Sequence, residues 1–125
     1  VLENAISTAF PDYPLYILKT DETPENAADL VSSSHIFIGD HITSLIHIIW
    51  MNPSSHVIDA TNKDYACNKW AEKLAHKLGV NYKAIYDDDQ CQCKDFDCYL
   101  TKASAATQVD VDKVLDAIRS VIPAR

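Results

Sequence analysis

The amino-acid sequence predicts a single α/β domain, with a parallel sheet of about four strands covered by helices on both faces. Short apolar runs alternate along the chain with segments of helical periodicity, which is the order typical of a parallel sheet. The stretch His35–Ala60 contains strand, helix and strand in the order of one βαβ unit, whose connection is right-handed. A length of 125 residues, 47% of them hydrophobic, suits one core.

The chain before this unit predicts a helix, a strand and a second helix. Leu15–Leu18 is a short apolar run that favours a strand. Thr23-Pro24-Glu25 marks a helix start, in which Thr23 is the cap and Pro24 occupies the first turn. The first helix covers residues 1–10, and its apolar face consists of Leu2, Ala5, Ile6 and Ala9.

The central unit predicts two buried strands joined by a helix. His35–Ile38 is an apolar run that ends at the turn residue Gly39, as expected for a strand buried on both faces. A buried helix is expected over His41–Met51 and a second strand over His56–Ala60. The face that this helix buries consists of Ile42, Leu45, Ile46, Ile49 and Trp50.

The last part of the chain predicts two helices and one strand around an acidic loop. A long helix is expected over Lys63–Leu78, ended by Gly79, and a strand over Val80–Tyr86. The loop Asp87–Tyr99 follows, and the final helix covers Asp110–Ile122. The apolar stripes are Cys67, Trp70, Ala71, Leu74 and Leu78 in the first helix and Val111, Val114, Leu115, Ile118 and Ile122 in the second.

The topology predicts where a ligand would bind. Ligands of open parallel sheets bind beyond the carboxyl ends of the strands. This rule places Gly39-Asp40-His41 and Asp59 at one edge of the sheet, where we expect a site. The chain contains only two glycines, too few for a Gly-x-Gly-x-x-Gly pyrophosphate loop.

Charge and hydropathy exclude two classes of partner. A formal net charge of -7 argues against a nucleic acid, because phosphate binding needs a basic surface. No apolar run approaches the roughly 20 residues of a membrane-spanning helix, so we expect no membrane span in this chain.

The cysteines Cys67, Cys91, Cys93 and Cys98 indicate two disulfides in a protein of the secretory pathway. Cys91 and Cys93 are too close in sequence to pair with each other. One arrangement that fits joins Cys67 to a loop cysteine and places the second bridge inside the loop. A four-thiolate zinc site and free thiols in an intracellular protein are the alternatives.

No other metal site is expected from the sequence. His41 and His47 are too far apart on one helix to share an ion. Asp87-Asp88-Asp89 is interpreted as part of a solvated acidic loop, with a calcium site as the minor alternative.

Residues 39–47 (GDHITSLIH), then Pro53, then the strand Val57-Ile58-Asp59, resemble the carboxyl-terminal half of one glycosyltransferase group. This group includes the EGF-domain-specific O-linked N-acetylglucosamine transferases and the plant arabinoxylan xylosyltransferases. Its signature is a hydrophobic strand followed by Gly-x-His-Gly-Ala-Gly-Leu-Thr-Asn, and Trp70–Tyr82 is similar to a later helix and strand of the group. The resemblance implies a Rossmann-like domain, one half of a GT-B architecture and the C-terminal half of a longer protein.

The resemblance also implies a nucleotide sugar as donor, a uridine diphosphate sugar, bound without a metal or other cofactor. His41 would face the diphosphate and Asp59 the ribose. Ile42 and Ser44 replace two glycines of the signature and His47 replaces its Asn, so we expect donor binding to be weakened or lost. The implied binding residues are Gly39, Asp40, His41, Thr43, Ser44 and Asp59.

The function implied by the resemblance is glycosyl transfer from a nucleotide sugar to a hydroxyl of a protein or glycan, in the endoplasmic reticulum or Golgi lumen or outside the cell. Members of the group use an amino-terminal half to contact the acceptor and supply the catalytic base. We therefore assign no catalytic residue, and expect activity only with that half or a partner chain. The alternative is a catalytically inactive fold that serves as a structural or interaction module in an assembly, inside the cell if the cysteines are reduced.

Overall fold

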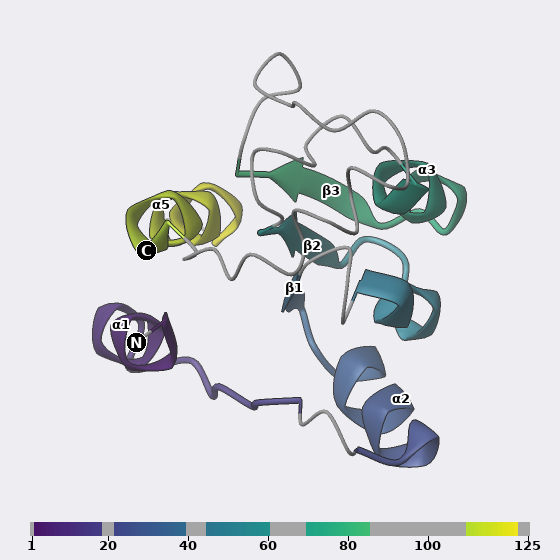
Figure 1. Cartoon of the computed structure of the whole chain (residues 1–125), viewed down its shortest axis with the longest axis horizontal. Helices are drawn as coiled ribbons and strands as arrows, with labels where there is room; N and C mark the ends of the chain where they lie inside the picture. Colours follow the sequence, from purple (N-terminus) through teal and green to yellow (C-terminus); the bar gives the residue numbers. More distant parts are fainter. Residues whose placement is uncertain (1, 19–21, 40–44, 61–69, 86–109, 123–125) are drawn as a thin grey trace, which may run out of the picture.

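The computed structural model describes residues 2–18, 22–39, 45–60, 70–85 and 110–122. These residues form a mixed α/β structure with an open parallel sheet of three strands (Figure 1). The elements follow in the order α1 (Leu2–Ala9), α2 (Pro24–Ser32), β1 (Ile36–Gly39), the 3-10 helix η1 (Leu45–Trp50), β2 (His56–Asp59), α3 (Trp70–Lys77), β3 (Asn81–Ala84) and α5 (Val111–Val121).

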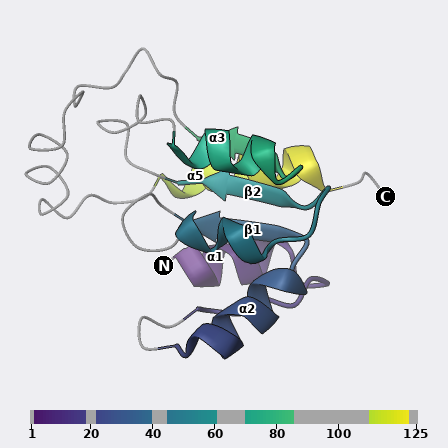
Figure 2. The ribbon, with the colours of Figure 1, turned by 90° about the vertical axis from the view of Figure 1, so that its right-hand side faces the viewer.

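The sheet has the strand order β1-β2-β3, and both neighbouring pairs are parallel. Figure 2 shows β1 and β2 side by side and pointing the same way. Gly39 pairs with Asp59, and Asp59 pairs with Ala84, so the three strands end together. The α/β class, the parallel sheet and the three strands that begin near residues 36, 56 and 81 are therefore confirmed.

The expected sheet of about four strands is wrong for the described residues, because Leu15–Leu18 is not a strand of this sheet. These residues follow the turn after α1 and lie outside the sheet, and Tyr16 is 70% exposed. A strand is stabilised by the hydrogen bonds and side chains of a neighbour, and the apolar pattern of Leu15–Leu18 cannot show whether a neighbour lies within hydrogen-bonding distance. A cavity separates this segment from β1.

Helices cover both faces of the sheet, as the sequence predicts. In Figure 1, α1 and α5 lie on one side of the strands and α2 and α3 on the other. Side chains of β2 alternate between the two cores: Val57 belongs to one and Ile58 to the other, and both are fully buried. The first core consists of Val31, Phe37, Leu45, Ile48, Met51, Val57, Ala71, Ala75 and Val80. The second consists of Ile58, Ala60, Ile85, Val114, Ala117 and Ile118.

The helix expected over His41–Met51 is tighter in the part that the structure describes, and it buries a different face there. Within the described residues it is the 3-10 helix η1, in which side chains three positions apart are eclipsed. Leu45, Ile48 and Met51 are accordingly buried together. The expected buried face is wrong at three positions: Ile46, Ile49 and Trp50 are exposed.

The starts of α2 and α5 follow the sequence closely. The Thr23 hydroxyl accepts a hydrogen bond from the Asn26 N–H at 3.2 Å, which confirms the expected cap of α2. Asp110 caps α5 in the same way, accepting from the Lys113 N–H at 3.2 Å. The part of the expected long helix that precedes Trp70 lies outside the described residues.

Gly79 ends α3 in the left-handed conformation that the sequence predicts, with a φ of 73°. The Val80 N–H donates to the Ala75 carbonyl at 2.9 Å and the Gly79 N–H to the His76 carbonyl at 3.3 Å. These two bonds form a Schellman motif, in which the last carbonyls of a helix find backbone donors. Residues with a Cβ rarely adopt this conformation, so glycine is favoured at this turn.

Gly79→Ala is expected to lower the free energy of unfolding by about 1–2 kcal/mol. The added Cβ would meet the Pro53 Cβ at 3.5 Å, an ordinary contact, so the effect comes from the backbone rather than from a clash. Urea denaturation measures it, with Gly79→Asn as the matched control because asparagine tolerates positive φ. Equal stability of wild type and Gly79→Ala would show that Gly79 does not hold this conformation.

Candidate functional site

The carboxyl ends of the three strands form one edge of the sheet, the edge where the sequence predicts a site. Gly39 of β1 lies beside Asp59 of β2, and Ala84 of β3 lies on the other side of Asp59. The Ala60 N–H donates to the Gly39 carbonyl at 2.7 Å, so β1 and β2 stay paired up to their last residues. The two predicted site residues that the structure describes, Gly39 and Asp59, are therefore neighbours.

Asp59 is the buried carboxyl group of this edge, with 2% of its surface exposed. The Tyr82 hydroxyl of β3 donates a hydrogen bond to Oδ2 of Asp59. Because side chains alternate along a strand, Asp59 lies on the same face of β2 as Val57, the face covered by the first core. Tyr82 packs against that core, which places its hydroxyl beside the carboxylate.

Burial of a carboxylate is unfavourable unless hydrogen bonds replace those it makes with water. The bond from Tyr82 supplies part of that compensation and holds the carboxylate in one orientation. Such a group can accept hydrogen bonds from the hydroxyls of a bound sugar or ribose. In the present structure the carboxylate is closed off from solvent, so a ligand could reach it only if neighbouring side chains moved.

Most of the predicted site residues lie outside the described residues. This applies to Asp40, His41, Thr43 and Ser44 and to Ile42. The four cysteines, Cys67, Cys91, Cys93 and Cys98, also lie outside them, so the disulfide, zinc and free-thiol alternatives stay open. Within the described ranges, no group of three or more His, Cys, Asp or Glu side chains is placed to hold a metal ion.

Sequence reasoning gave no role to Tyr82, although it is the partner of the candidate carboxylate. A tyrosine whose ring packs against a core indicates that its hydroxyl needs a hydrogen-bond partner. If the register of β2 and β3 were known, it would place the Tyr82 hydroxyl near the end of β2. The register, however, comes only from the structure.

His47, which stands where the glycosyltransferase signature has Asn, packs against the middle of β1. Its ring meets the Phe37 ring edge-on, with the centroids 6.4 Å apart and the planes at 74°. This contact gives His47 a packing role beside the first core.

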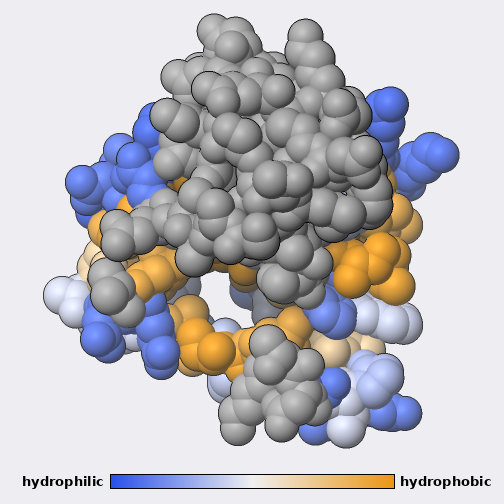
Figure 3. All heavy atoms as spheres, in the orientation of Figure 1, coloured by the Kyte–Doolittle hydropathy of each residue, from blue (hydrophilic) through white to orange (hydrophobic). Residues whose placement is uncertain are grey.

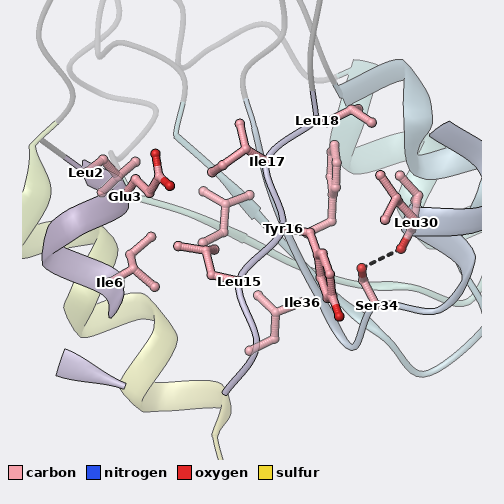
Figure 4. A pocket seen from close by; sticks show the side chains of 13 residues that line it. Leu2, Glu3, Ile6, Leu15, Tyr16, Ile17, Leu18, Leu30, Ser34 and Ile36 are labelled. Carbon is pink, nitrogen blue, oxygen red and sulfur yellow. Dashed lines mark hydrogen bonds between the residues drawn. The ribbon is translucent and has the colours of Figure 1, made fainter. Parts of the chain in front are cut away.

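Two cavities lie on the other side of β1, away from this edge. The larger, about 310 Å³, is lined by α1, Leu15–Leu18, the end of α2 and β1 (Figure 4). The other, about 250 Å³, is lined by the turn after α1, the start of β1 and α5. Neither cavity includes Gly39 or Asp59 among its lining residues.

No helix within the described ranges combines the length and the apolar character that crossing a bilayer requires. Comparison of the chain with protein-family models, with curated proteins and with solved structures gave no match.

Proposed function

We propose that the carboxyl edge of the sheet binds a nucleotide-sugar donor in a Rossmann-like half of a GT-B glycosyltransferase. The observation that carries the proposal is the pairing of Gly39 with Asp59 at the ends of parallel β1 and β2. This arrangement matches the position that the sequence resemblance gives to a diphosphate and a ribose. It also agrees with the general location of ligands on open parallel sheets.

In this proposal the diphosphate lies beyond the end of β1 at Gly39, and backbone N–H groups are the expected donors to its oxygens. Gly39 ends β1 without a side chain, so a ligand can come close to the backbone at this point. The ribose would lie beside Asp59, one strand further along the edge.

Binding of the ribose requires a change at Asp59, because the carboxylate is buried and accepts a hydrogen bond from Tyr82. In the proposed complex a ribose hydroxyl replaces the tyrosine hydroxyl as a donor to Asp59. One hydroxyl donor exchanges for another, so the carboxylate keeps its hydrogen bond while Tyr82 turns away.

The reaction proposed for the complete enzyme is transfer of the sugar to a hydroxyl of a protein or glycan. The bond between the anomeric carbon and the phosphate oxygen breaks, and a bond from that carbon to the acceptor oxygen forms. The acceptor proton passes to a base, and the nucleoside diphosphate leaves. Acceptor contacts and the base would come from an amino-terminal half or a partner chain.

A second candidate function is that of a structural or interaction module without catalysis. The pairing of Asp59 with Tyr82 inside the fold favours it, because a carboxylate with 2% exposure already serves the packing of β2 against β3. In this case the Asp59 side chain stabilises the sheet and has no ligand.

Calorimetric titration with uridine diphosphate and its sugar conjugates separates the two functions. We expect wild type to bind, Asp59→Asn to bind ten- to a hundredfold more weakly, as for loss of a hydrogen bond to a charged group, and Ile42→Gly to bind more tightly. Tyr82→Phe should also bind more tightly, because no tyrosine hydroxyl competes for Asp59.

Adenosine diphosphate is the control for nonspecific binding of phosphates, and circular dichroism establishes that each variant is folded. Binding gained only in Ile42→Gly would mark a donor-type fold used as a structural module. If neither folded wild type nor folded Ile42→Gly binds, the donor-binding proposal is contradicted.

A further inference from the structure

The outer edge of β1 presents backbone groups that the sheet does not use. The His35 carbonyl accepts from His56 at 2.8 Å and the Gly39 carbonyl accepts from Ala60 at 2.7 Å. Bonded residues alternate along a parallel strand, so Phe37 also faces β2, whereas Ile36 and Ile38 turn their N–H and C=O groups away from it. Since β1 is an edge strand, these groups face no further strand within the described residues.

Leu15–Leu18 lies opposite this edge, across the 310 Å³ cavity. Tyr13–Tyr16 share the smaller cavity with His35 and Ile36, and Leu15–Leu18 share the larger one with Ile36–Ile38. The beginning of one segment is thus near the beginning of the other, and both run in the same direction. Figure 3 shows an opening through this part of the molecule with hydrophobic residues around it.

The side chains of Leu15–Leu18 already alternate as in a strand. Figure 4 shows Leu15 and Ile17 pointing toward α1, and Tyr16 and Leu18 pointing toward the α2 side. Leu18 packs against the first core. If this segment joined the sheet, its two faces would continue the two cores without a change of side chain orientation.

We propose that Leu15–Leu18 closes onto the edge of β1 as a fourth parallel strand, and that the structure shows the open form. This inference does not depend on the proposed function. Closing would supply partners for the backbone groups of Ile36 and Ile38, remove the apolar cavity, and bury Tyr16 and Ile17, which are now largely exposed. Helix α2 would then connect two parallel strands, as the crossover of a βαβ unit does.

The chemistry of the cavity indicates which kind of molecule would cover the outer edge of β1. Apolar side chains alone would suit a lipid or another apolar molecule, but the adjacent backbone donors and acceptors suit a polypeptide strand. Leu15–Leu18 is such a strand, is covalently attached through α2, and already lines the cavity. Its effective concentration at the edge therefore exceeds that of any separate chain.

Amide hydrogen exchange of the full chain, read residue by residue by NMR, tests the proposal. The closed form predicts exchange of Ile36 and Ile38 slowed by about tenfold or more, together with amides of Leu15–Leu18. Phe37 and Gly39 are internal controls, because their amides face β2 in either form. NOEs between backbone protons of Leu15–Leu18 and Ile36–Ile38 are expected at the same time.

Proline substitution identifies the strand that gives the protection. Neighbouring strand residues direct their N–H groups to opposite sides, so one of Tyr16 and Ile17 directs its N–H toward β1. Proline at that one position should restore fast exchange at Ile36 and Ile38. Ile17→Val, which keeps the N–H and the β-branched side chain, should leave exchange slow. Phe37 and Gly39 should stay protected in each variant that is folded.

Two results would overturn the proposal. One is fast exchange at Ile36 and Ile38 in wild type, with Phe37 and Gly39 protected and no NOEs across the cavity. The other is slow exchange that both proline variants leave unchanged, or that depends on protein concentration, because another segment or a second copy would then cover the edge. The NOEs decide the case in wild type alone if the proline variants do not fold.

Discussion

Ile48→Ala is expected to lower the free energy of unfolding by about 3 kcal/mol, whereas Ile49→Ala lowers it by less than about 1 kcal/mol. The two residues are identical and adjacent, and only their burial differs: Ile48 is 0% exposed and Ile49 is 45% exposed. Truncation of Ile48 leaves a cavity between η1 and the first core, while truncation of Ile49 leaves solvent. Chemical denaturation in urea, with equal slopes for all variants, measures both values.

This pair also tests which helical face of residues 45–50 is buried. The sequence predicts a face that includes Leu45 and Ile49, whereas the structure buries Leu45 and Ile48 and leaves Ile49 exposed. Leu45→Ala should therefore resemble Ile48→Ala, and Ile46→Ala should resemble Ile49→Ala. A larger loss of stability in Ile49→Ala than in Ile48→Ala would contradict the 3-10 arrangement.

Tyr82→Phe is expected to lower the free energy of unfolding by about 1–3 kcal/mol, because it removes a donor from the buried carboxylate of Asp59. Asp59→Asn should lower it by a similar amount, since the weaker acceptor changes the same contact. The double variant should lose less than the sum, with a coupling energy of about 1–2 kcal/mol. Urea denaturation of the four proteins gives this double-mutant cycle.

Tyr16→Phe is the matched control, because it removes a tyrosine hydroxyl that does not bond to Asp59 and keeps the ring, whether Leu15–Leu18 is open or closed. We expect it to change the stability by no more than about 0.5 kcal/mol. Strictly additive losses in Tyr82→Phe and Asp59→Asn would show that the two side chains do not interact. The cycle measures stability and needs no ligand, so it is independent of the calorimetric titration.

The parts of the fold that the sequence predicts are those with a local signal. Thr23 and Asp110 are helix caps with the residue types that caps require, and both helices begin where expected. β2 contains the apolar pair Val57-Ile58 before the acidic residue Asp59, and it forms the centre of the sheet. Gly79 occupies a position at which a side chain would be strained.

The errors arise where the local signal is ambiguous. Nearly every residue of Leu45–Trp50 is apolar, so the pattern fits a period of 3.0 about as well as one of 3.6. Leu15–Leu18 has the composition of a strand, but pairing depends on the distance to β1, which no local pattern contains.

The sequence predicts where the candidate site lies better than it predicts the burial and hydrogen bonding of the side chains there. The topology rule placed Gly39 and Asp59 at one edge, and the register confirms that they are neighbours. The sequence did not predict that Asp59 is buried or that Tyr82 is its donor, because both depend on which face of β2 meets which face of β3. A shift of register would have produced a different partner.

Hydrogen bonds at the amino-terminal ends of β2 and β3 determine that register. The Ser54 N–H donates to the Gly79 carbonyl at 2.8 Å, and the Asn81 N–H donates to the Ser55 carbonyl at 2.9 Å. A deletion of one residue between Gly79 and Asn81 would move β3 by one position and reverse the faces of its side chains. Tyr82 would then no longer lie on the face of Asp59. Changes in chain length at this turn should therefore alter the candidate site from the far end of the strands, while single substitutions of nearby exposed side chains should not.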